Sequence, residues 1–156
     1  MLDLNIPGFG KIKIEHIIFD FNGTLAVDGK LIDGLATPLA DLAARFKLHV
    51  VTGDTRGTAK AELASIKTEI ITIPQDNQAI AKADYIIQLD PDHVIAIGNG
   101  RNDQQMLQMA HIGIAVLGRE GMSVSAVSSA DIIVPDIFSA IELVMDAQRI
   151  MATLRS

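Results

Sequence analysis

Short apolar segments alternate with amphipathic segments along almost the whole chain. Apolar runs bounded by turn residues predict strands, and apolar residues repeating at helical spacing predict helices. Strands are predicted at residues 11–21, 47–51, 68–73, 93–98, 112–116 and 131–134. Helices are predicted at residues 37–46, 55–66, 77–89, 103–110 and 136–154, with a further one in GMSVSAVSSA. This order is typical of an α/β fold, in which helices cover both faces of a mainly parallel sheet. We therefore expect a three-layer, Rossmann-like domain.

Local signals refine the ends of these elements. The segment LDLNIPGF before residue 11 could pair with the first strand as a hairpin, with Pro7 and Gly8 in the turn. Thr37 is predicted to cap the helix at 37–46, and Asp136 the long C-terminal helix.

Length and charge limit the classes of function. The 156 residues fit one domain, residues 1–156. The net charge of −6, with no dense basic stretch, argues against nucleic acid or an anionic membrane as the main partner. The absence of cysteine excludes disulfides and thiolate chemistry. We find no signal peptide and no apolar run near the roughly 20 residues of a membrane span, so the expected location is the cytoplasm.

Three polar, glycine-containing clusters follow predicted strands. DFNGT follows the first strand, TGDTRG the strand at 47–51, and GNGRND the strand at 93–98. Ligands of open α/β sheets bind beyond the carboxyl ends of the strands. The three clusters are therefore predicted to meet at one edge of the sheet.

The residue types in these clusters suit phosphoryl chemistry. The Asp20 carboxylate could bind a hard cation or attack phosphorus. Backbone N–H groups around Gly23 and Thr24 and the hydroxyl of Thr52 could face an anion. Lys82 could reach the same edge as a positive charge. Together with the oxygens of GNGRND, these groups predict a nucleophile, a Mg²⁺ site and a phosphoryl cradle.

Four segments in this order also resemble a known family. FDFNGTLA, VVTGD, AKADYIIQL and AIGNGRND look like the four motifs of the haloacid dehalogenase (HAD) superfamily. Within it, the chain is most similar to the phosphorylation domain of P-type ATPases and to small soluble proteins that resemble that domain. The resemblance implies a HAD-like hydrolase and phosphatase with Mg²⁺ as cofactor.

The resemblance implies a role for each matching residue. Asp20 corresponds to the nucleophile that becomes an aspartyl phosphate, and Lys82 to the lysine that holds nucleophile and phosphoryl group together. The implied phosphate-binding residues are Asn22, Gly23, Thr52, Gly53 and Asn102. The implied metal ligands are Asp20, the backbone carbonyl of Asn22, Asn99 and Asp103.

Two residues depart from the family pattern. Asn22 stands where HAD phosphatases usually have the aspartate that protonates the leaving group and activates water. Asn99 stands where the first acid of the fourth motif is usual. We expect slow turnover or a lingering phosphoenzyme. The alternatives are a weak or inactive phosphate-binding, regulatory module, and a fragment whose partner supplies the missing groups. ATPase-like phosphoryl transfer stays open, although the nucleotide-binding insertion is missing.

The spacing of the motifs leaves no room for a cap domain. Only 31 residues separate Asp20 from Thr52, and 29 separate Thr52 from Lys82. The expected site is open to a phosphorylated small molecule or protein, or is closed by a neighbouring copy in a homo-oligomer. Arg56 and Arg101 are candidates for substrate recognition or solvated charges. The four histidines show no metal-ligand spacing and are interpreted as structural.

Overall fold

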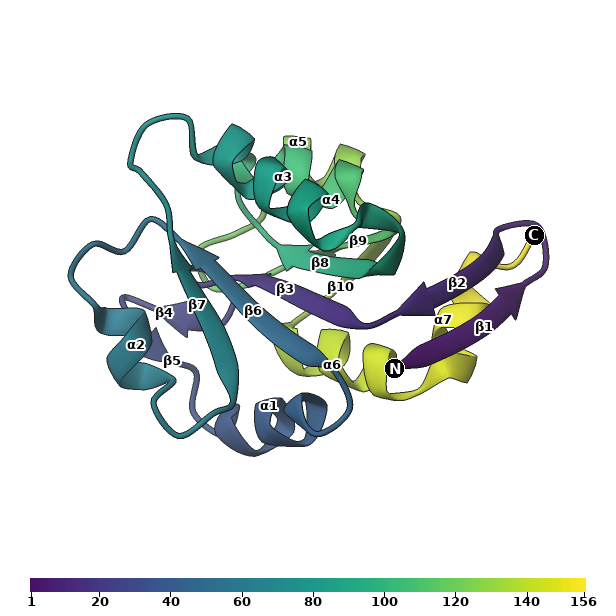
Figure 1. Ribbon diagram of the computed structural model, residues 1–156, viewed down its shortest axis with the longest axis horizontal. Coiled ribbons are helices and arrows are strands. Elements are labelled where there is room, and N and C mark those ends of the chain that lie inside the picture. The colour runs from purple at the N-terminus through teal and green to yellow at the C-terminus, as the bar shows by residue number, and fades with distance from the viewer.

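Six parallel strands form the central sheet of the computed structural model, which describes residues 1–156 (Figure 1). Their order is β10-β9-β8-β3-β6-β7. The strands are β3 (His16–Asp20), β6 (Lys47–Thr52), β7 (Thr68–Thr72), β8 (Val94–Gly98), β9 (Ile112–Val116) and β10 (Ile132–Val134). The first strand of the sheet, β3, therefore lies at its centre, paired with β6 on one side and β8 on the other.

Helices cover both faces of this sheet (Figure 1). The helices are α1 (Ala36–Ala43), α2 (Thr58–Glu62), α3 (Gln78–Leu89), α4 (Gln104–Met109), α5 (Val124–Ser129), α6 (Ile137–Met145) and α7 (Ala147–Leu154). Two short 3-10 turns, η1 (Pro91–His93) and η2 (Arg101–Asp103), flank β8. In Figure 1, α3, α4 and α5 lie above the sheet and α1 and α6 below it. This is the predicted three-layer α/β arrangement.

The side chains of β3 divide between two apolar cores, which explains why its sequence is continuously apolar. Ile17 and Phe19 belong to the core that includes α1 and α6. Ile18, which points to the opposite face, belongs to the core that includes α3 and α4. All three are completely buried. A strand with both faces covered loses the polar alternation of a half-exposed strand, and its end is held firmly in place.

The predicted strand at 11–21 is in fact two strands. It divides at Glu15 into β2 (Gly10–Ile14) and β3. β2 pairs antiparallel with β1 (Leu2–Ile6), which confirms the predicted hairpin. Gly8 in its turn has a φ of +81°, a conformation that glycine adopts without strain.

The C-terminal region also differs from the prediction. The helix expected at 136–154 is broken at Asp146 into α6 and α7. The side chain of Asp146 accepts the N–H of Gln148 and so starts the second helix. The break lets α7 turn and pack against β1. The predicted cap at Asp136 is confirmed by its bond from the N–H of Ser139, at 2.7 Å.

The predicted cap at Thr37 is wrong. Helix α1 begins one residue earlier, at Ala36, and Leu35 occupies the capping position without a side-chain hydrogen bond. The completely buried Leu35 side chain anchors this end of the helix through packing in place of a polar cap.

No cap domain interrupts the motifs. Between β3 and β6 the chain forms only a small hairpin of β4 (Ala26–Val27) and β5 (Lys30–Leu31), followed by α1. The backbone N–H of Leu31 donates to Glu62 on α2, which ties this hairpin to the neighbouring helix. The carboxyl edge of the sheet is thus bordered by a short hairpin.

The histidines form local structure away from the carboxyl edge of β3. His16 at the start of β3 lies 2.9 Å from His49, and His49 lies 2.9 Å from the hydroxyl of Tyr85. Burial, together with the charges of His16 and Lys47, lowers the pKa of His49 to about 4. His49 is therefore neutral near pH 7 and acts as a hydrogen-bonding core residue.

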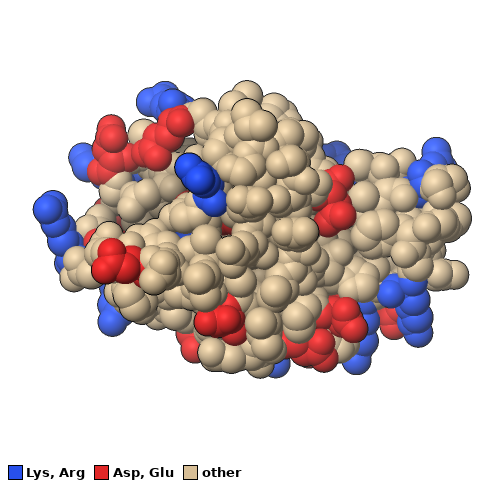
Figure 2. Space-filling model, turned by 90° about the horizontal axis from the view of Figure 1, so that it is seen from above, with Lys and Arg blue, Asp and Glu red and all other residues tan.

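The surface of the helical face is unevenly charged. Figure 2 looks onto the face formed by α3, α4 and α5, where charged side chains lie mainly along the margin. Both signs of charge border a hollow at the left end.

None of the helices has the length and apolar character needed to cross a membrane.

Candidate active site

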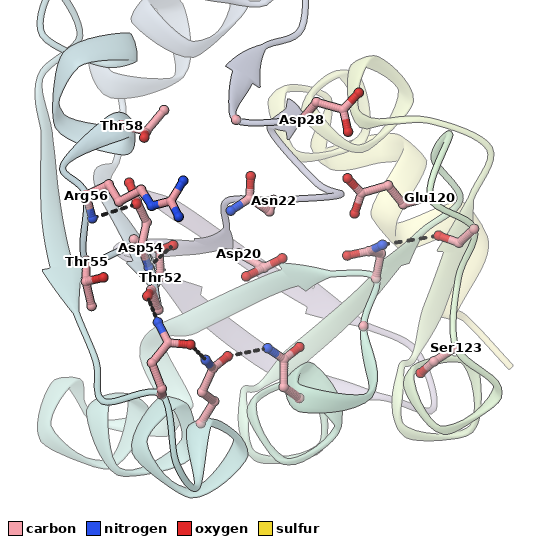
Figure 3. A pocket seen from close by; sticks show the side chains of 18 of the residues that line it. Asp20, Asn22, Asp28, Thr52, Asp54, Thr55, Arg56, Thr58, Glu120 and Ser123 are labelled. Atoms are coloured by element: carbon pink, nitrogen blue, oxygen red, sulfur yellow. Dashed lines mark hydrogen bonds between the residues drawn. The ribbon is translucent and has the colours of Figure 1, made fainter.

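A polar cleft of about 1010 Å³ opens at the carboxyl end of the sheet (Figure 3). It is lined by 19 residues, of which Met122 alone is hydrophobic. The loops after β3, β6 and β8 all contribute, so the three polar clusters do meet as predicted. Asp20, Asn22, Thr52, Gly53, Asn99 and Asn102 all line the cleft. A wall this polar suits a charged, hydrated ligand and has little apolar surface with which to bind an apolar one.

Lys82 joins the two acidic residues of the predicted site. Its Nζ lies 2.6 Å from Oδ1 of Asp20 and 2.6 Å from Oδ1 of Asp103. Lys82 comes from α3, Asp20 from the end of β3, and Asp103 from η2. All three are buried, with Asp20 7% exposed and Asp103 fully enclosed. A lysine this deeply buried is stable only when paired, and here it has two partners.

Burial and charge shift the proton equilibria of this group. Burial, with the nearby charge of Asp103, raises the pKa of Asp20 to about 7 even though Lys82 acts in the opposite direction. Burial alone would lower the pKa of Lys82, but Asp20 and Asp103 together raise it above its ordinary value. Lys82 therefore remains a cation near neutral pH. Ionisation of Asp20 costs free energy, because its carboxylate is buried near a second negative charge. Such perturbed groups at a cleft are typical of functional sites.

Both carboxylate oxygens of Asp103 already have hydrogen-bond partners. While Oδ1 contacts Lys82, Oδ2 accepts the backbone N–H groups of Asn99 at 3.0 Å and Gly100 at 2.9 Å. Asp103 does not line the cleft. In this geometry Asp103 orients Lys82 and folds the GNGRND loop. Direct metal coordination by Asp103 would require one of these contacts to be exchanged.

The loop after β3 reaches the cleft through Asn22, whereas Gly23 and Thr24 lie outside its lining. Asn22 is exposed and points into the cleft, where Figure 3 shows it above Asp20. Gly23 has a φ of +84°, and a side chain there would collide with Asn99 and Glu120. Thr24 is buried, and its hydroxyl donates to Oδ1 of Asn99 at 3.3 Å. The glycine thus lets three loops approach one another closely.

A chain of amide side chains lines the wall beyond Thr52. Gln75 donates to the carbonyl of Gly53, Gln78 donates to Gln75 at 3.4 Å, and Asn102 donates to Gln78 at 2.7 Å (Figure 3). The two glutamines were missed at the sequence level. They follow β7, so the rule that ligands bind at the carboxyl ends of strands could have found them.

Charged side chains of the cleft are mostly acidic. Asp28 at the tip of the β4–β5 hairpin and Glu120 after β9 were not predicted, yet both line the cleft. Arg56 lines the cleft, and Arg101 does not. Asp54 accepts the N–H groups of Arg56 and Ala59 and so stabilises the turn into α2.

The donor set fits a hard cation with modest charge. Asp20 is a carboxylate at the cleft, and the backbone of Asn22 and the amide of Asn99 provide neutral oxygens of the kind that Mg²⁺ accepts. No group of three or more His, Cys, Asp or Glu side chains is arranged around a common point. A cation here would keep several of its waters, as Mg²⁺ usually does.

Comparison with known proteins identifies the family to which these motifs belong. Residues 59–131 match the family model of haloacid dehalogenase-like hydrolases. The chain is 39% identical over 83 residues to an uncharacterised protein of Methanocaldococcus jannaschii, covering 51% of this chain and 89% of that protein. The chain belongs to the haloacid dehalogenase-like hydrolases. This confirms the resemblance inferred from the four motifs.

A longer relative of this HAD-like chain is a cation-transporting ATPase. It is 34% identical over 139 residues to the cation-transporting P-type ATPase B of Mycobacterium leprae, which is 86% of this chain but only 18% of the transporter. The similarity covers most of this chain, but the chain spans less than a fifth of that relative's length.

Solved structures share the fold of this HAD-like chain. One is the crystal structure of 3-deoxy-D-manno-octulosonate 8-phosphate phosphatase from Moraxella catarrhalis with magnesium, phosphate and a KDO molecule. The TM-score is 0.67 at 21% identity, covering 91% of this chain and 94% of that one. The match confirms the Rossmann-like HAD fold.

Proposed function

We propose that this chain is a Mg²⁺-dependent phosphohydrolase that works through an aspartyl phosphate on Asp20. The observation that carries the proposal is the position of Asp20. It ends the central strand at the floor of an open polar cleft, and Lys82 holds it at 2.6 Å. A fixed, desolvated carboxylate beside a permanent cation is suited to attack phosphorus, because phosphoryl transfer depends mainly on positioning and charge compensation.

The residues of the cleft divide the work between them. An oxygen of Asp20 would attack phosphorus, and the bond from phosphorus to the leaving oxygen would break. Thr52, Gly53 and Asn102 would donate to the phosphoryl oxygens, and Lys82 would balance the negative charge. Water would then attack the phosphorus of the aspartyl phosphate, which releases inorganic phosphate and regenerates Asp20.

Mg²⁺ would be held by Asp20, the backbone carbonyl of Asn22 and Asn99. Its charge would bring the phosphoryl group and the Asp20 carboxylate together. The magnesium and phosphate bound to the Moraxella catarrhalis phosphatase support this assignment. The protein's own limitation is Asn22, which can neither protonate the leaving oxygen nor activate water. Solvent would have to supply both proton transfers, so turnover should be slow.

The substrate we propose is a phosphorylated small molecule. The cleft is open and has no cap, and its outer wall carries Asp28, Glu120 and the glutamine side chains. Residues 1–156 would act as a single core domain, because the strand ends at one edge of the sheet, the loops that follow them and helix α3 together supply the groups of the site.

The test is hydrolysis of a generic aryl phosphate by the wild type and by Asp20→Ala, each with and without Mg²⁺. We expect slow hydrolysis that requires both Mg²⁺ and Asp20. Equal background rates in the two proteins would refute the phosphohydrolase. They would favour the second candidate, a phosphate-binding regulatory module, for which the amides at residues 22 and 99 already argue.

A further inference from the structure

The cleft contains an acidic side chain that the four motifs do not account for. Glu120 lies in the turn Gly118–Gly121 between β9 and α5 and lines the cleft. Figure 3 shows its carboxylate directed into the cleft, on the side that also carries Asn22 and Asp28. It has no ion-pair or hydrogen-bond partner among the contacts of the structure, and Arg119 beside it is exposed.

The turn that carries Glu120 is fastened to the proposed cation site. The amide Nδ2 of Asn99 donates to the carbonyl of Gly121 at 3.1 Å. The backbone N–H of Ser123 donates to the carbonyl of Asn99 at 2.8 Å. The N–H of Gly121 closes the turn on the carbonyl of Gly118 at 3.0 Å. Residues on both sides of Glu120 are therefore tied to Asn99 or to each other.

The Glu120 carboxylate also lies close to the loop after β3. A methyl group on Gly23 would lie 2.8 Å from Oε2 of Glu120 and 2.9 Å from Oδ1 of Asn99. The same point in space is thus bordered by both side chains. Glu120 and the amide of Asn99 flank the segment whose Asn22 carbonyl we assign to Mg²⁺.

The asparagine at residue 99 accounts for this arrangement. An amide can donate a hydrogen bond to the Gly121 carbonyl, whereas an aspartate could not. The exchange of acid for amide removes one negative charge from the cation site, but the same amide anchors the turn that brings Glu120 in. Glu120 thus provides a negative charge close to the residue that lacks one.

We infer that Glu120 supplies a second negative charge beside the ligands of the Mg²⁺ site and so compensates for the neutral Asn99. This inference rests on the proposed function, since it assigns a residue to the cation of that reaction. Mg²⁺ keeps several waters in most protein sites, and a carboxylate just outside the ligands can accept hydrogen bonds from them. Glu120 is therefore a positioning residue for the cation.

The test is calorimetric titration of Mg²⁺ into the metal-free full chain, without substrate. We expect Glu120→Gln to weaken Mg²⁺ binding by about tenfold, as is typical when an outer partner of a metal site is removed. Glu142→Gln is the matched control, because Glu142 lies exposed on α6 outside the cleft. Its Mg²⁺ affinity should equal that of the wild type.

A second variant separates charge from a general disturbance of the loop. Adding Asn99→Asp to Glu120→Gln restores the number of carboxylates and should recover most of the lost affinity. Three results would overturn the inference. Glu120→Gln could bind Mg²⁺ as tightly as the wild type, or the wild type could fail to bind Mg²⁺. The double variant could also fold but bind Mg²⁺ as weakly as Glu120→Gln. Intact Mg²⁺ binding without Asp20-dependent hydrolysis would instead refute the phosphohydrolase and leave the role of Glu120 standing.

Discussion

Replacing Lys82 by methionine should lower both the rate of turnover and the stability of the fold. Lys82 is 1% exposed and contacts Asp20 and Asp103 at 2.6 Å each. Without it, two buried carboxylates face each other with no counter-charge. Removing one partner of a buried ion pair typically costs about 3–5 kcal/mol. We expect a loss of that size in urea unfolding, and a fall in hydrolysis of about 10²- to 10³-fold or more.

Two further variants test whether the effect comes from the loss of this buried counter-charge. Lys60→Met removes an exposed lysine from α2 and should change neither property. Adding Asp20→Asn to Lys82→Met removes one of the two unpaired carboxylates, so it should recover part of the stability but none of the activity. If Lys82→Met were as stable as the wild type, the three buried charges would not be coupled as the structure indicates.

Replacing Asn22 by aspartate should raise turnover. Asn22 lines the cleft and is exposed, so a carboxyl group at this position can meet a leaving group without burial cost. General acid–base assistance is worth up to about 10²- to 10⁴-fold, and we expect an increase of about 10²-fold in aryl phosphate hydrolysis. The measurement is kcat in saturating Mg²⁺, with the rate of phosphate release followed directly.

The gain must come from proton transfer and not from an added negative charge. Asn102→Asp adds the same charge to the cleft but breaks the amide contact to Gln78, so it should not raise turnover. Asn22→Ser offers no comparable acid and should stay near the wild-type rate. An unchanged or lower rate in Asn22→Asp would show that Asn22 is not the bottleneck.

The central sheet was predictable because its strands are buried on both faces. Ile17, Ile18 and Phe19 produce a continuous apolar run, and the alternation of such runs with helices is the pattern of a parallel sheet. Breaks inside elements were harder to predict. At Glu15 the backbone bonds to His93 and Lys47, and after Asp146 helix α7 packs against β1. Both sets of contacts join segments that are far apart in the sequence.

The predicted site residues were found because they follow strand ends. Asp20, Thr52 and Asn99 lie together at one edge, and Lys82 reaches Asp20 from α3. The contacts of Asp103 were not predictable, because nothing in GNGRND indicates that its carboxylate folds back onto the N–H groups of Asn99 and Gly100. Glu120, in a turn after β9, shows no motif, and its relevance depends on how that turn packs against Gly23.

The most direct measurement of the central claim is detection of a covalent phosphate on Asp20. The wild type would be mixed with aryl phosphate and Mg²⁺, quenched in acid during turnover and analysed by peptide mass spectrometry. Asn22 should slow hydrolysis of the intermediate, so the peptide containing Asp20 should gain the mass of one phosphoryl group in a Mg²⁺-dependent way. Hydrolysis that proceeds with an unmodified Asp20 peptide at every quench time, or a phosphoryl group on another residue, would contradict the account.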